Sequence, residues 1–159
     1  KTRNVYKTTK RKRRIIMSKQ YTIINKSNEL NFFEKYALIE SPAIASLKTL
    51  ENGDLICVGS WVEYKTVNNS GDEIICVSIQ DANTGEVYSG QSATFRETFF
   101  DIIDRMSEHK DEVDMIFIEV LHRTSKSGRD YLICALVSPD RAFSKMGISS
   151  NEFLMNKPE

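Results

Sequence analysis

Basic and aromatic side chains gather between residues 123 and 131, where the chain reads RTSKSGRDY. Arg123, Lys126 and Arg129 supply three cations, and Tyr131 follows as the aromatic residue. Guanidinium and ammonium groups bind phosphates, and an aromatic ring stacks on a nucleobase. This composition favours binding to a nucleic-acid strand with exposed bases. The alternative is a solvated hairpin whose charges only keep the protein soluble.

A second aromatic residue and a second cation lie on a long strand expected over residues 55–67. Side chains of a strand alternate between two faces, which here are Ile56, Val58, Val62 and Tyr64 against Leu55, Cys57, Trp61 and Lys65. If the first face points into the core, Trp61 and Lys65 point outward and form a candidate stacking platform. The alternative places Trp61 under the N-terminal segment or at a subunit interface.

Catalytic and metal-binding patterns are missing from the sequence. It contains no G-x-S-x-G, no glycine-rich phosphate loop and no H-E-x-x-H. The three cysteines are odd in number, form no C-x-x-C pair and each fall within an expected strand, which indicates buried thiols. We therefore expect no enzymatic activity, no metal, no cofactor and no small-molecule substrate.

Charge is distributed unevenly along a chain whose formal net charge is zero. Residues 1–16 hold eight Lys or Arg and no acid, which leaves 14 basic and 22 acidic residues in 17–159, a net of −8. We expect a basic disordered tail over 1–20, whose KRKRR run is either a nucleic-acid-binding arm or a nuclear address. A second interpretation is that 1–16 are upstream sequence, since MSKQYTII from Met17 is a plausible protein start.

Five strands and one helix are expected between residues 55 and 137. Gly59 marks a bend in the first strand, so that this strand can pair with two neighbours. The strands are expected at 55–67, 73–81, 86–93, 115–124 and 129–137. The helix is expected from Phe95 or Arg96 to about His109, after a capping box formed by Thr94 and Glu97.

This order predicts a mainly β protein, a five-stranded OB-fold barrel with a helix between strands three and four. The OB-fold domain is expected over 21–138, with a C-terminal extension over 139–159. A helical lead-in is expected over 27–39, capped by Ser27 or Asn28, with a further helix start at Ser41-Pro42. The competing folds are another small barrel and an α+β sheet with one helix on a face.

Three stretches of the chain carry a family resemblance: NGDLICVGSWVEYKT, TGEVYSGQSATFRETFFDII and SKSGRDYLICAL. With them, residues 17–137 resemble single-stranded DNA-binding proteins encoded by conjugative plasmids and phages of Gram-positive bacteria. The resemblance implies an OB-fold, single-stranded DNA binding with little sequence preference, and a role in plasmid transfer or replication. Housekeeping bacterial single-strand binders end in an acidic tail finishing in Asp, Pro and Phe, which recruits other replication proteins. The present sequence closes with FLMNKPE, so we do not expect that recruiting function.

The expected function is therefore to coat single-stranded DNA, with the contact surface formed by Trp61, Lys65, Arg123, Lys126, Arg129 and Tyr131. Because residues 17–159 are acidic, we expect self-association along the DNA to add affinity through many weak contacts. Two alternatives remain: a protein-interaction or assembly module built on an OB barrel, and an RNA-binding protein. No segment is long and apolar enough to span a membrane, so a cytoplasmic location is expected.

Overall fold

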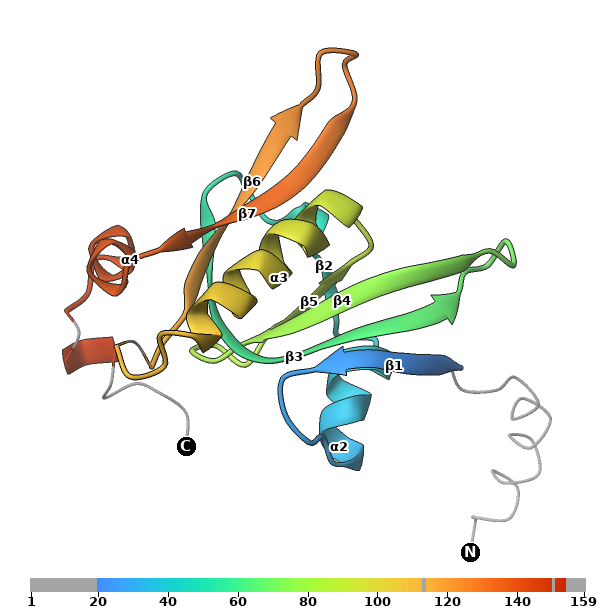
Figure 1. The fold of residues 1–159 in the computed structure, drawn as a ribbon, viewed down its shortest axis with the longest axis horizontal. Helices are drawn as coiled ribbons and strands as arrows, with labels where there is room; N and C mark the ends of the chain where they lie inside the picture. The colour runs from blue at the N-terminus through green and yellow to red at the C-terminus, as the bar shows by residue number, and fades with distance from the viewer. Residues whose placement is uncertain (1–19, 113, 150, 154–159) are drawn as a thin grey trace, which may run out of the picture.

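The computed structural model describes residues 20–112, 114–149 and 151–153. It is a mainly β protein whose seven-stranded sheet curls around one long helix (Figure 1). In chain order the elements are β1 Tyr21–Lys26, α2 Phe32–Lys35, the π-helical turn η1 Tyr36–Glu40, β2 Ala45–Ser46, the 3₁₀ turn η2 Leu47–Thr49, β3 Asp54–Val67, β4 Glu73–Asp81, β5 Val87–Gly90, α3 Ala93–Ser107, β6 Phe117–Thr124, β7 Asp130–Val137 and α4 Pro139–Met146. Among the described residues, none of the helices is long and apolar enough to cross a membrane.

The long strand β3 joins the two halves of the sheet, as its length and central glycine predicted. Residues 54–57 pair with β6, and the part from Val58 onward pairs with β4. The regular pairing with β4 is interrupted between Val58 and Trp61. Gly59 lies in this interruption, where an added Cβ would come within 2.9 Å of the Gln80 carbonyl oxygen. The bend therefore needs a residue without a side chain.

The same irregularity reverses the predicted faces of β3. Ile56 and Trp61 both belong to the core inside the curl, although they are five positions apart and strict alternation would separate them. Val62 and Tyr64 pack instead on the outer surface of the sheet. An extra residue at a bulge shifts the alternation by one, so every assignment beyond Gly59 changes face.

The sheet is a curled half-barrel, consistent with an OB-like barrel, but it has more strands than the five expected. Its order is β2-β5-β4-β3-β6-β7, with β1 paired to β3, so β1 and β2 are additions. Within this order β5 and β7 are not neighbours. The region between them is called the seam. α3 covers the edge of β7 there, since the Thr94 hydroxyl donates to the Leu132 carbonyl at 2.7 Å and the Cys134 N–H donates to the Thr98 hydroxyl at 3.0 Å.

Helix α3 lies between β5 and β6 in the chain and fills the inside of the curl (Figure 1). Phe95, Phe99 and Ile102 are its buried residues. The predicted capping box at Thr94 and Glu97 is wrong, because Ser92 is the N-cap and its hydroxyl accepts from the Phe95 N–H. Thr94 is instead used for the contact with β7 described above.

The N-terminal segment differs most from its prediction. The expected helix over 27–39 is only the four residues of α2 followed by the π-helical turn η1, and its cap is Asn31. The expected helix start at Ser41 is wrong too, because a turn, β2 and η2 follow there. Residues 30–46, called the covering segment, place Leu30, Leu38 and Ile39 against the outer surface of the sheet, where Val62, Tyr64, Cys76 and Val87 are buried.

The described part of the C-terminal extension is docked on the barrel. Pro139 begins α4 after the N-cap Ser138, and Gly147 ends it in the left-handed conformation at φ 72°. Phe143 and Phe153 pack with Phe117 of β6, with ring centroids 5.5 and 5.7 Å from that ring. The predicted tail over 1–20 lies almost wholly outside the described residues, as does the end of the chain from 154.

Candidate nucleic-acid interface

The β6–β7 hairpin presents the predicted basic cluster on a well-defined turn. The N–H of Ser125 donates to the Arg129 carbonyl at 2.8 Å, and the Arg129 N–H donates to the Ser125 hydroxyl at 3.1 Å. Gly128 closes the turn at φ 88°, a left-handed conformation that suits glycine. The turn therefore holds Lys126 and Arg129 in solvent at the tip of the hairpin.

Arg123 and Tyr131 face each other across the two strands of the hairpin. They are cross-strand partners, so their side chains share one face, while His122, Leu132, Thr124 and Asp130 share the other. Tyr131 is half-buried and Arg123 is exposed. The structure thus brings together four of the six predicted site residues on one hairpin.

These cations lack acidic partners within the described chain. Arg123, Lys126 and Arg129, called the hairpin cations, form no ion pair with the described residues, and neither does Lys48 of η2. Six of the other eight described cations lie within 4.0 Å of a carboxylate, namely Lys26, Lys65, Arg96, Arg105, Arg141 and Lys145, while Lys35 and Lys110 also form no ion pair with the described residues. A cation without a carboxylate partner keeps its full charge for a phosphate.

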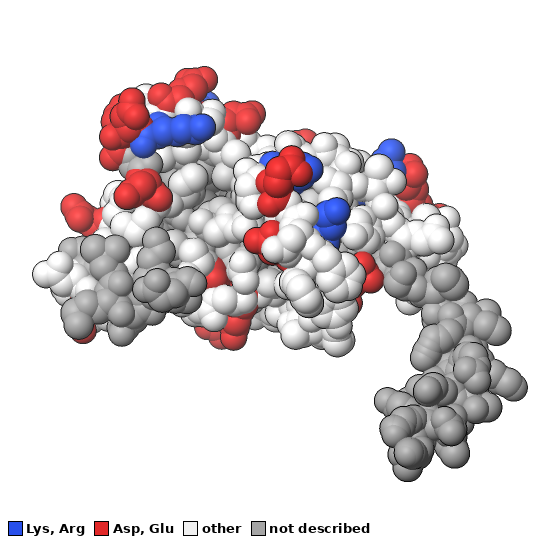
Figure 2. Space-filling model, turned by 90° about the horizontal axis from the view of Figure 1, so that it is seen from below, with Lys and Arg blue, Asp and Glu red and all other residues white. Residues whose placement is uncertain are grey.

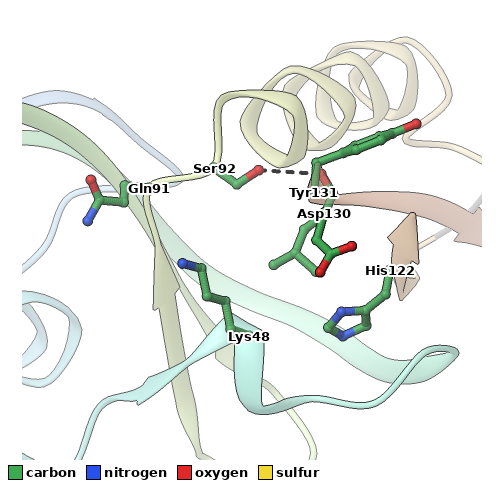
Figure 3. Close-up of a pocket in the computed structure, with 7 residues that line it drawn as sticks. Lys48, Gln91, Ser92, His122, Asp130 and Tyr131 are labelled. Carbon is green, nitrogen blue, oxygen red and sulfur yellow. Dashed lines mark hydrogen bonds between the residues drawn. The ribbon is translucent and has the colours of Figure 1, made fainter. Parts of the chain in front are cut away.

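A hollow of about 640 Å³ opens in the seam below the hairpin (Figure 3). We call it the seam pocket; its lining residues are Lys48, Gln91, Ser92, His122, Asp130, Tyr131 and Leu132. Asp130 and His122 extend into it from the hairpin, Lys48 and Gln91 lie on the opposite side, and the Tyr131 ring points toward α3 (Figure 3). Three separate stretches of the chain therefore meet around one opening.

Hydrogen bonds to the segment before β3 fix one wall of the seam pocket. The His122 Nε2 lies 2.6 Å from the Leu50 carbonyl oxygen, and the His122 N–H donates to the Asn52 side chain at 2.8 Å. These contacts hold the hairpin beside η2, which carries Lys48. The predicted site did not include Lys48, Gln91 or Asp130. Lys48 and Gln91 come near Tyr131 only in the folded chain, and Asp130, although next to Tyr131 in the sequence, carries no charge that would attract a phosphate.

Trp61 is not the exposed platform that was predicted. It is only 7% exposed and belongs to the inner core. Its ring lies edge-on against Phe99 and Phe100 of α3, with centroids 5.9 and 5.2 Å away. The reason is the bulge at Gly59, which turns Trp61 inward.

Lys65 lies apart from the hairpin cations. It is on the arm formed by β3 and β4, and its Nζ is 4.0 Å from the Glu73 carboxylate. The tip of this arm and the tip of the β6–β7 hairpin point in different directions (Figure 1). Lys65 therefore does not extend the basic surface of the hairpin.

The outer surface of β4 and β5 is occupied by the chain itself. These strands correspond to strands two and three of an OB barrel, whose outer face commonly binds oligonucleotides. Here the covering segment lies on that face and buries Val62, Tyr64 and Val87. The β6–β7 hairpin, which corresponds to the loop between strands four and five of an OB barrel, is exposed at its tip, and the seam pocket opens beside it.

Elsewhere the surface is acidic. The described residues hold 12 Lys or Arg and 21 Asp or Glu, a net of −9. Acidic side chains outnumber basic ones on the face seen in Figure 2. The contrast makes the hairpin cations a local positive feature on a negative protein.

The cysteines are buried, as predicted. Burial raises the pKa of the Cys134 thiol to about 11, although the Thr98 hydroxyl beside it acts in the opposite direction. A thiol with such a pKa stays protonated at neutral pH and is a poor nucleophile. Cys134 is thus part of the core beside α3.

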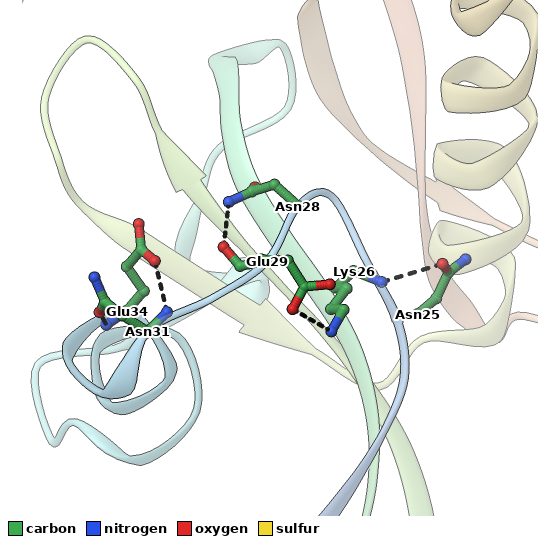
Figure 4. A network of polar contacts seen from close by, with 6 residues as sticks. All are labelled: Asn25, Lys26, Asn28, Glu29, Asn31 and Glu34. Carbon is green, nitrogen blue, oxygen red and sulfur yellow. Dashed lines mark hydrogen bonds and ion pairs between the residues drawn. The ribbon is translucent and has the colours of Figure 1, made fainter.

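Exposed aromatic rings lie at the other end of the molecule, on α2 and η1. Phe32, Phe33 and Tyr36 are 72%, 77% and 45% exposed, and we call them the aromatic patch. A capping box holds the start of α2, where Asn31 and Glu34 exchange hydrogen bonds of 2.8 and 2.9 Å (Figure 4). Lys26 and Glu29 form an ion pair at 3.2 Å just before this segment. The aromatic patch therefore lies on a segment whose conformation is held by local polar contacts.

Comparison with known proteins identifies the family. Residues 35–137 match the model of the family described as phage single-stranded DNA-binding protein, a span that runs from the end of α2 to the end of β7. No curated protein and no solved structure matches the chain. Since the match covers well over half of the sequence, the chain belongs to the family of phage single-stranded DNA-binding proteins.

Proposed function

We propose that this protein binds single-stranded DNA through the β6–β7 hairpin, with little sequence preference and without enzymatic activity. The observation that carries the proposal is the set of hairpin cations that lack carboxylate partners in the described chain, beside Tyr131 on an otherwise acidic protein. The cations neutralise phosphates, and the ring stacks on a base whatever its identity. The family membership supports the same ligand.

The test is fluorescence anisotropy of a labelled oligo-dT titrated with the full chain at low and moderate salt. Saturable binding that weakens with salt is expected, because phosphate contacts release counterions. Duplex DNA and oligo-U of equal length serve as competitors and distinguish the ligand from duplex DNA and RNA. Absence of binding to oligo-dT at either salt concentration would refute the proposal.

We further propose that copies of the chain associate along the DNA through the aromatic patch. The patch and the hairpin lie at opposite ends of the molecule (Figure 1), so one copy can contact another while its hairpin holds DNA. Exposed aromatic rings on a segment held by hydrogen bonds, as here by the capping box of α2, are typical of interaction surfaces. Linking copies multiplies a weak contact per copy.

Sedimentation on long oligo-dT tests this association with the double variant Phe32→Ser/Phe33→Ser. The variant is expected to bind a short oligonucleotide normally but to lose cooperative loading on a long one. Leu136→Ser, which removes an exposed apolar side chain on β7, is the matched control. Unchanged cooperativity in the double variant would exclude the patch.

The biological setting that we propose is the coating of single strands during plasmid transfer or replication, as for PrgE-like plasmid-encoded proteins. The resemblance of the three sequence stretches supports it. Removal of the coding sequence from a transferring plasmid is expected to lower transfer frequency, which a mating assay measures. Transfer and copy number that both stay unchanged would argue against this setting.

The aromatic patch also favours a second candidate function, a protein-interaction or assembly barrel. An acidic surface with exposed aromatic rings suits a basic protein partner. This function is supported if the titration shows no binding to any oligonucleotide while the chain still associates through the patch.

A further inference from the structure

The seam pocket differs in chemistry from the hairpin above it. The tip of the hairpin carries only positive charge, whereas the seam pocket is lined by one ammonium group, Lys48, and one carboxylate, Asp130. The other polar groups of its lining are the Gln91 amide, the Ser92 hydroxyl and the His122 imidazole. The Asp130 carboxylate repels phosphate oxygens, so this lining suits a phosphate less well than the hairpin cations do. The lining suits a neutral polar heterocycle that presents both hydrogen-bond donors and acceptors.

The polar groups of the seam pocket retain hydrogen-bonding capacity for a ligand. Asp130 Oδ1 accepts from the Thr124 hydroxyl at 3.0 Å, which leaves the second oxygen with no hydrogen-bond donor in the described chain. The His122 Nε2 faces the Leu50 carbonyl oxygen, which only accepts, so Nε2 carries the hydrogen of that bond and Nδ1 is not used in it. The Lys48 ammonium group and the Gln91 amide likewise form no hydrogen bond with other described side chains.

We propose that the seam pocket holds one base of the bound strand and favours cytosine over thymine. This inference rests on the proposed binding of single-stranded DNA by the hairpin. Asp130 accepts from the amino group of cytosine, and Lys48 donates to the acceptors on the rest of the same edge. Thymine places a carbonyl oxygen where cytosine has the amino group, so the carboxylate of Asp130 repels it. The two pyrimidines have nearly the same size, so the preference follows from hydrogen bonding alone.

The location of the pocket fits a strand held by the hairpin. Tyr131 lines the seam pocket and is also the cross-strand partner of Arg123. When one base stacks on the Tyr131 ring, the neighbouring base of the strand therefore lies close to the pocket. The apolar wall is formed by Leu132, and Ser92 is bound to the Leu132 carbonyl (Figure 3). The strand thus keeps its phosphates on the hairpin cations while one base enters the seam.

The experiment compares the affinity of the full chain for oligo-dC and oligo-dT of equal length at one salt concentration. The unaltered chain is expected to bind oligo-dC about fivefold more tightly, the low end for one good base contact. Asp130→Asn is expected to bring the ratio close to one, because its amide group donates to the thymine carbonyl. Asp140→Asn, on the exposed first turn of α4, removes an equal charge and is expected to keep the ratio.

Each outcome separates this inference from the proposed function. Equal binding of both oligonucleotides by the unaltered chain overturns the cytosine preference and leaves DNA binding in place. A preference that survives in Asp130→Asn also overturns the inference, because the discrimination then arises elsewhere. Absence of binding to either oligonucleotide refutes the proposed function itself. If Asp130→Asn does not fold, Lys48→Gln tests the opposite wall, and it too is expected to lower the ratio.

Discussion

The β6–β7 hairpin and the bent half of β3 each carry an aromatic residue and a cation, yet only the hairpin leaves them available. On the hairpin, Tyr131 is half-buried beside Arg123, which has no carboxylate partner in the described chain. On β3, Trp61 is packed under α3 and Lys65 faces Glu73. Residue types alone therefore do not define a binding surface.

The physical difference lies in what surrounds each strand. β3 is central, with β4 on one side, β1 or β6 on the other and α3 across its inner face, so an aromatic residue there joins the core. Glu63, next on the same face, is held by Arg96 of α3 at 3.5 Å. The tip of the hairpin extends beyond α3, where no element covers it in the described structure (Figure 1).

Replacing Trp61 by alanine tests the comparison with the largest expected effect. Removal of a buried aromatic side chain from a packed core lowers the free energy of unfolding by about 3–5 kcal/mol. Urea denaturation measures the loss, and Tyr131→Ala is the control with a much smaller loss. A stable Trp61→Ala protein with weakened DNA binding would show that the ring is accessible after all.

Tyr131→Ala is expected to act on binding rather than on folding. Loss of one stacking ring weakens the affinity for a short oligonucleotide by about 1–3 kcal/mol. Tyr131→Phe keeps the ring and should retain the affinity, as should Tyr36→Ala, which removes an aromatic ring from the distant patch. Equal affinities of all three variants would remove Tyr131 from the interface.

The double variant Lys126→Glu/Arg129→Glu tests whether the charges of the hairpin, and not those elsewhere on the protein, bind the phosphates. The slope of log K against log salt concentration should flatten by about 1.4, since each lost single-strand phosphate contact contributes about 0.7. The control is Lys26→Glu with Arg105→Glu, which changes the net charge equally but affects cations already paired with Glu29 and Asp101. If both pairs flatten the slope equally, the net charge matters and the hairpin does not.

Lys65→Ala has the smallest expected effect. The Lys65–Glu73 pair is 4.0 Å long and solvent-accessible, so its loss should change stability by less than about 1 kcal/mol. Affinity for oligo-dT should stay within error in the anisotropy titration. A clear loss of affinity would instead place the β3–β4 arm in the DNA interface together with the hairpin.

Local sequence patterns predicted the strands from β3 onward well but predicted the structure of the N-terminal segment poorly. β4 has the predicted bounds and β3 nearly so, because alternation and turn residues are local properties. Apolar residues over 27–39 indicated a helix, but Leu38 and Ile39 are buried on the sheet through a π-helical turn while Phe32 and Phe33 stay exposed. Packing against the sheet overrode helical periodicity there.

Local sequence features were enough to predict the strands β3 to β7 in their order along the chain, the bend at Gly59 and the basic β6–β7 hairpin, because each depends on neighbouring residues. The burial of Trp61 could not be predicted in this way, since the bulge in β3 reverses the faces of the β3 residues that follow it. Only the tertiary structure could form the seam pocket, whose walls come from η2, the β5–α3 junction and the hairpin. Contacts between distant segments leave no periodic signal in the sequence, so these features appear only when the sheet curls.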